Sequence, residues 1–168
     1  MTNKNIFIYN QLLKMLDTAE SIIKKGQAYV EEGKATEAEL MEARLIADMM
    51  PFVKQIQIIS DNVKGAISRM ASVENPKMED TESTFAQLLE RIEKTRAFVK
   101  TIDADAISTD VDSMTVKLPW MPEGMSWTGK QYFDGFVLQN AYFHVVTAYD
   151  ILRMKGVQLG KMDFIGNI

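Results

Sequence analysis

The chain has 168 residues, of which 46% are hydrophobic and 25% charged, as is typical of one globular domain spanning residues 1–168. A net charge of −4 without a clustered basic face argues against a nucleic-acid partner, and we expect no membrane span and no secretion signal. With no cysteine and a single histidine, the chain offers few transition-metal ligands, and a cytoplasmic location is expected.

A long amphipathic helix is predicted over residues 10–30, because apolar side chains recur there at the spacing of one buried stripe. Gly33 follows in a position that commonly ends a helix. Thr36 and Glu39 have the spacing of a capping box, which predicts a short helical piece through Met41.

Two further helices are predicted in the middle of the chain. Pro51 fits the first turn of a helix over residues 51–70, and Pro76 lies beyond its end. The next apolar stripe runs over residues 85–99 and predicts a third long helix. Its candidate capping residues are Asp80, Thr81 and Ser83.

The pattern changes between residues 103 and 128. Apolar and polar residues alternate over 114–118, and turn-forming residues follow over 119–124, which together predict a small β-hairpin. The hairpin carries Trp120 and Trp127, which are expected either to form a lid or partner contact or to pack back onto the helices.

A long fourth helix is predicted after Gly129, ending at Gly156, with the residues beyond forming a tail. Four amphipathic helices cannot bury their stripes alone and are expected to pack together. The predicted fold class is therefore an all-α four-helix bundle, with the small β-hairpin inserted before the last long helix.

Several strings spread over essentially the whole chain resemble a bacterial family of domains of unknown function within the DinB/YfiT-like superfamily. That superfamily is similar in fold, and the resemblance implies an up-down-down-up order of the four helices. The strings are Asp48-Met49-Met50-Pro51-Phe52, Gln55-Ile56-Gln57, Ser60-Asp61, Pro76, Asp80-Thr81-Glu82-Ser83-Thr84-Phe85, Tyr142-Phe143-His144-Val145-Val146-Thr147-Ala148-Tyr149 and Gly156-Val157-Gln158-Leu159-Gly160-Lys161.

The resemblance also implies where a metal site would lie, because the superfamily typically gathers three histidines around a divalent metal. Some of its members use that metal for thiol transfer. His144 matches one ligand of the last helix, and Asn140 projects from the same face where a second histidine would stand. On the second long helix the nearest candidate for the third ligand is Asp61, although Gln57 or Asn62 are alternatives for the inward-facing position. This set is a poor one for zinc, so no conventional metal triad and no cofactor are predicted, and His144 is the only weak metal candidate.

Two other interpretations of His144 need no metal. The imidazole is either a partly buried structural side chain, or it donates a hydrogen bond to Asp61, which orients it toward a small pocket lined by Asn140 and aromatic residues. The pocket candidates are Asp61, Asn140, His144 and Gln57.

Three hypotheses of function follow, and the sequence does not decide whether the protein is an enzyme. The first is a small-molecule-binding domain with a polar pocket between helices. The alternatives are a degenerate metal-dependent transferase of the DinB-like type and a homodimeric structural or interaction protein.

Overall fold

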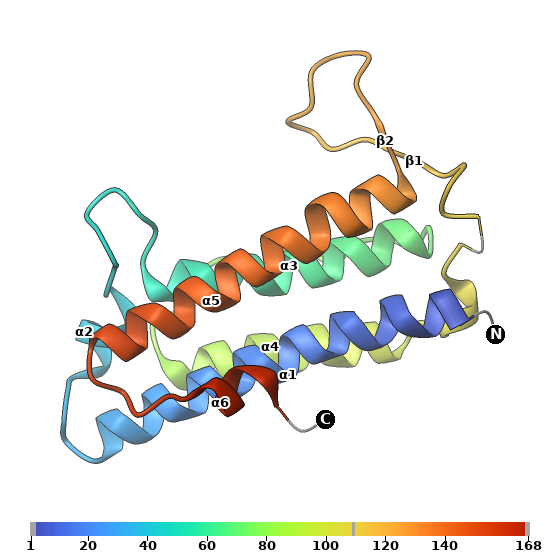
Figure 1. Cartoon of the computed structure of the whole chain (residues 1–168). Helices are drawn as coiled ribbons and strands as arrows, with labels where there is room; N and C mark the ends of the chain where they lie inside the picture. The colour runs from blue at the N-terminus through green and yellow to red at the C-terminus, as the bar shows by residue number, and fades with distance from the viewer. Residues whose placement is uncertain (1–2, 109, 167–168) are drawn as a thin grey trace.

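The computed structural model describes residues 3–108 and 110–166, which are mostly helical with one small antiparallel sheet (Figure 1). The α-helices are α1 (Asn3–Glu31), α2 (Glu37–Met41), α3 (Phe52–Met70), α4 (Phe85–Lys100), α5 (Leu138–Met154) and α6 (Lys161–Ile165). The remaining elements are the 3₁₀-helix η1 (Ala104–Ala106), the π-helix η2 (Gln131–Val137) and the strands β1 (Thr115–Val116) and β2 (Trp127–Thr128).

The four long helices pack on one another through their apolar stripes. α3 packs against α5 and α4, and α1 packs against α4, α3 and α5, so that each long helix covers part of the others' apolar surface (Figure 1). None of the helices in the described part of the chain combines the length and apolar character needed to span a bilayer. Core side chains with no exposed surface include Leu12, Leu16, Ile56, Ile59, Leu88, Ile92, Ala148 and Ile151.

The start of α1 differs from the sequence prediction, because the helix is already formed at residue 3 rather than at residue 10. Two tertiary contacts account for the extra turns. The side chain of Ile8 is buried, and the Asn5 amide Nδ2 donates a hydrogen bond to the carbonyl of Ile107 at 2.9 Å. These contacts stabilise a segment whose sequence carries no strong start signal.

The capping box predicted for α2 is confirmed. The Thr36 hydroxyl accepts a hydrogen bond from the Glu39 backbone N–H, and the Glu39 carboxylate accepts one from the Thr36 N–H. α2 also contributes to the next helix, because the Glu37 carboxylate accepts the otherwise unpaired N–H of Phe85 at 2.6 Å.

The predicted capping residues of α4 are wrong. The helix is capped by Thr84, and not by Asp80, Thr81 or Ser83. Thr84 and Gln87 form a reciprocal capping box, with both hydrogen bonds at 3.2 Å. Only Thr84 has a Gln or Glu three residues into the helix with which to close this box, so the pair fixes the helix start. Asp80 is engaged by Lys54 and Arg91 instead.

The predicted hairpin is confirmed as a two-residue pairing, in which Thr115 lies opposite Thr128 and Val116 opposite Trp127. The tail predicted after Gly156 is wrong in one respect, because it contains the short helix α6, which packs on α1. The Thr18 hydroxyl donates to the carbonyl of Phe164 at 3.2 Å and so attaches α6 to α1.

Candidate functional site

A cavity of about 360 Å³ lies where α3, η2 and the start of α5 meet the segment between the two strands. Two of the four residues predicted from the sequence, Asp61 of α3 and Asn140 of α5, line it. Asn62 and Arg69 of α3 line it as well, and Trp120 comes from the segment between the strands. His144 and Gln57 are not among its lining residues.

Aromatic side chains form one wall of this cavity. Trp120 lies 5.6 Å from Phe136 and 5.7 Å from Trp127 between ring centroids, and Tyr132 is stacked on Phe136 at 6.0 Å. These separations are those of favourable aromatic pairs. Trp120, near the start of the loop between the strands, therefore packs against η2 at the rim of the cavity, although it keeps 60% of its surface exposed.

The cavity lies beside an irregular stretch of helix. The N–H of Leu138 bonds to the carbonyl of Phe133, five residues earlier, as in a π-helix. Where η2 passes into α5, the carbonyl of Val137 accepts a hydrogen bond from Asn62 Nδ2 at 2.8 Å. Short π-helical segments occur often at functional sites, and this one presents Tyr132 and Phe136 to the cavity.

Asp61 is held by two cations rather than by the histidine. Its Oδ1 accepts from Arg91 Nη2 at 2.9 Å and from Lys64 Nζ at 3.2 Å. The expected hydrogen bond from His144 is therefore wrong: the Nδ1 of His144 lies 2.7 Å from Oε1 of Gln55. Asp61 lies six positions after Gln55, so the two side chains point about 120° apart around the helix axis.

The tautomer of His144 follows from its partner. The Gln55 Nε2 donates to the carbonyl of Met50 at 2.9 Å, so Oε1 is free to accept. Nδ1 therefore carries the proton that it donates to Gln55, and Nε2 keeps its lone pair. Gln55 was not predicted as a site residue. The sequence feature that could have indicated it is a polar side chain next to Ile56 in an apolar stripe.

Burial lowers the pKa of His144 below its ordinary value of 6.5, which makes stability depend on pH. The folded state binds a proton on this imidazole less readily than the unfolded chain does, so the stabilisation is complete above 6.5 and is lost as the pH falls below it. We expect unfolding in urea to show a steeper loss of stability between about pH 7.5 and 5.5 in the native chain than in His144→Gln. Equal slopes would contradict a half-buried imidazole that is less readily protonated in the folded chain.

Gln57 belongs to a different network on the α4 side of α3. Its Nε2 donates to Glu82 Oε2 at 2.8 Å, and the same carboxylate accepts from Arg91. Arg91 is 2% exposed and also pairs with Asp61 and Asp80. Burial alone would lower the pKa of Arg91, but its hydrogen bond to the Glu82 carboxylate and the charges of the three carboxylates outweigh it and raise the pKa.

The sequence analysis missed Arg91, which links the predicted candidates Asp61 and Gln57 through Glu82. A signal was present, because Arg91 lies three residues after Leu88 and four before Thr95, on the apolar stripe of the predicted helix. A charged residue on such a stripe needs a buried partner.

The residues present do not fit the divalent metal site that the superfamily resemblance implies. Within residues 3–108 and 110–166, no three His, Cys, Asp or Glu side chains are grouped so that they could hold a metal ion. The partner of His144 is a neutral amide, and the carboxylate of Asp61 is already paired with two cations that compete with a metal.

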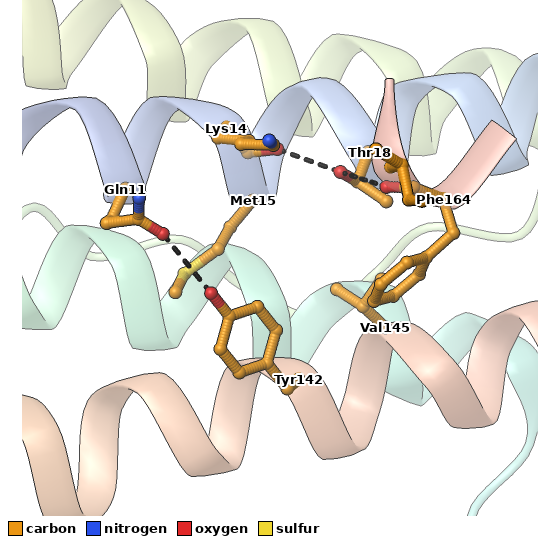
Figure 2. Close-up of a pocket in the computed structure, with 8 residues that line it drawn as sticks. Gln11, Lys14, Met15, Thr18, Tyr142, Val145 and Phe164 are labelled. Carbon is orange, nitrogen blue, oxygen red and sulfur yellow. Dashed lines mark hydrogen bonds between the residues drawn. The ribbon is translucent and has the colours of Figure 1, made fainter. Parts of the chain in front are cut away.

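A second cavity, of about 520 Å³, lies between α1, α5 and α6 and contains none of the predicted residues (Figure 2). Two side-chain hydrogen bonds cross it: the Tyr142 hydroxyl donates to Gln11 Oε1 at 3.2 Å, and the Thr18 hydroxyl donates to the carbonyl of Phe164 at 3.2 Å (Figure 2). Like the cavity beside η2, it offers mainly apolar surface.

Two similarities to known proteins indicate the family of this chain. A family model described as "Domain of unknown function (DUF1993)" matches residues 7–165. The chain is also similar to a crystal structure of a DinB family member protein from Shewanella denitrificans, with a TM-score of 0.88 and 31% sequence identity, covering 95% of this chain and 90% of that one. No curated protein matches the chain.

Proposed function

Because this chain belongs to the DUF1993 family, a family of domains of unknown function in the DinB-like superfamily, we propose that it binds a small organic molecule in the cavity beside η2. The proposal rests on one observation: Asp61 and Asn140 both line a cavity that has an aromatic wall. These two residues come from different helices and were selected from the sequence as pocket residues.

Two amides supply unused hydrogen-bonding capacity at this cavity. Among the described residues, neither the side chain of Asn140 nor the Oδ1 of Asn62 has a hydrogen-bond partner. Asn62 is only 9% exposed, so its remaining acceptor sits at the cavity wall rather than in open solvent. A few polar groups that converge on an aromatic cavity are the usual means by which a protein orients a small ligand.

We further propose that the whole chain is a single domain with the up-down-down-up order of a four-helix bundle. The colour gradient supports this, because α3 and α4 run in one direction and α1 and α5 in the opposite one (Figure 1). Two consecutive helices that run parallel need a connection that spans the length of the first one. Residues 71–84, which join α3 to α4, are long enough to do so. The homodimer and the cytoplasmic location expected from the sequence stay predictions.

Intrinsic fluorescence tests ligand binding directly, because the chain has only two tryptophans: Trp120 lines the cavity, and Trp127 packs against Trp120. A panel of sugars, nucleosides, amines and carboxylates is titrated while tryptophan emission and melting temperature are recorded. We expect at least one compound to change both. Asn140→Ala should weaken its binding about 2-fold to 10-fold through the loss of a hydrogen bond.

Gln11→Ala is the matched control, since Gln11 is a half-buried amide that lines the other cavity. It should leave the affinity unchanged. The proposal fails if no compound of any charge changes the emission, or if binding is lost in Gln11→Ala and kept in Asn140→Ala.

A further inference from the structure

We propose that the ligand of the cavity beside η2 is a small aromatic carboxylate, whose carboxylate group is bound by Arg69. The inference rests on the proposed function, because it names the ligand class of the same cavity. It is carried by the charges, the hydrogen bonds and the shape of the cavity wall.

Arg69 is the one charge on this wall that the described residues leave uncompensated. The only other charged lining residue is Asp61, which is paired with Arg91 and Lys64. Arg69 is half-buried, and no carboxylate of the described residues lies within ion-pair distance of it. A partly desolvated guanidinium beside aromatic rings favours an anion as its partner.

The guanidinium of Arg69 is fixed by three contacts with two residues, Gly65 and Tyr132. Its Nη1 donates to the carbonyl of Gly65 at 2.8 Å and to the Tyr132 hydroxyl at 3.2 Å, while its Cζ lies 5.8 Å from the centre of the Tyr132 ring. Burial raises the pKa of Tyr132, so this hydroxyl stays protonated. Nη2 and Nε of Arg69 have no acceptor among the described residues and remain available as a pair of donors, which suits the two oxygens of a carboxylate.

Gly65 makes this arrangement possible. A Cβ atom at position 65 would lie 2.6 Å from the Arg69 Nη1, so any other residue there would displace the guanidinium. A glycine in the middle of a helix is unfavourable compared with alanine. At this position the absence of a side chain lets Arg69 fold back along α3 toward the level of Asp61 and Asn62.

The aromatic part of the ligand is assigned from the aromatic wall beside Arg69. Trp120 and Phe136 present ring surface to the cavity, and a volume of about 360 Å³ suits a molecule with a single ring and a short acidic side chain. Stacking on these rings orients the ligand while Arg69 binds its anionic end. Asn140 and Asn62 add hydrogen bonds to its edge.

Three probes with one aromatic body and different charge test the inference: 3-phenylpropionate, its amide 3-phenylpropanamide, and 3-phenylpropylamine. Their dissociation constants are measured from tryptophan emission. We expect the carboxylate to bind about 10-fold to 150-fold more tightly than the amide, because a hydrogen-bonded charge pair replaces a neutral contact. The difference should shrink as the salt concentration rises.

Two variants address the role of Arg69. Arg69→Met should abolish the preference for the carboxylate, whereas the same substitution at the exposed Arg153, outside the cavity, should preserve it. Gly65→Ala keeps the charge but displaces the guanidinium, and alanine favours the helix, so a weakened preference in this variant cannot be ascribed to unfolding.

The outcomes separate this inference from the proposed function. If the amide binds as tightly as the carboxylate, or the amine binds best, the cavity is a ligand site but the anionic ligand class is wrong. If none of the three probes changes the emission while another compound of the panel does, the aromatic carboxylate is likewise excluded. A preference for the carboxylate that survives in both Arg69→Met and Gly65→Ala would overturn the role of Arg69.

Discussion

Arg91→Met is expected to lower the free energy of unfolding by about 3–5 kcal/mol, because it removes one partner of a buried charge network. Arg91 donates to Glu82 at 3.0 Å and pairs with Asp61 at 2.9 Å and Asp80 at 3.0 Å. Without it, three carboxylates repel one another. The melting temperature should fall by about 6–20 °C, at about 2–4 °C per kcal/mol for a chain of this size.

Lys94→Met is the control for this effect on the same helix. Among the described residues Lys94 pairs only with Glu90, and both side chains are 63% exposed, so its removal should cost less than about 1 kcal/mol. Urea denaturation followed by circular dichroism measures both variants. High salt should restore part of the stability lost in Arg91→Met, since it screens the repulsion. Similar stabilities of the two variants would contradict the buried network.

Phe85→Ala is expected to lower the free energy of unfolding by about 3–5 kcal/mol, because it opens a cavity in the core. Phe85 has no exposed surface, and its ring lies 5.7 Å from that of Phe52. It also fills the space over Gly26, where a Cβ atom would come within 2.7 Å of the ring. The loss comes from buried apolar area and from contacts that the neighbours cannot replace.

The same substitution at Phe143 supplies a matched control. The Phe143 side chain is 58% exposed on α5, so Phe143→Ala should change the stability by less than about 1 kcal/mol. Thermal melts and urea titrations of both variants measure the difference. If Phe143→Ala proved as destabilising as Phe85→Ala, then α5 would be covered by another surface in solution.

The Arg91 network also connects the fold to the proposed binding site. Arg91 holds Asp80 and Glu82, which lie in the connection before α4, and the same guanidinium neutralises Asp61 at the cavity. Removing Arg91 therefore changes the charge of the cavity wall from positive toward neutral. A variant that stays folded should bind an anionic aromatic probe more weakly than the native chain does.

The order and type of the long helices and of the hairpin followed from local patterns, whereas the π-helix η2 and the short helix α6 did not. Apolar spacing predicted the long helices, Thr36 with Glu39 predicted the start of α2, and alternation around Val116 predicted the hairpin. The selection of Asp61 and Asn140 as pocket residues remains a proposal, although both line one cavity. Signals of this kind depend on residues a few positions apart, which one sequence contains in full.

Tertiary structure alone decided which polar groups meet. Gln55 and His144 are separated by 89 positions, and Asp61 and Arg91 by 30, so no local rule pairs them. The apolar spacing that predicts α3 does not state which neighbouring helix Gln55, Gln57 or Asp61 faces. The sequence by itself thus determined where the helices form, whereas the packing of α3 between α4 and α5 determined which face meets which neighbour, because the rotation of a helix is fixed by contacts distant in the chain.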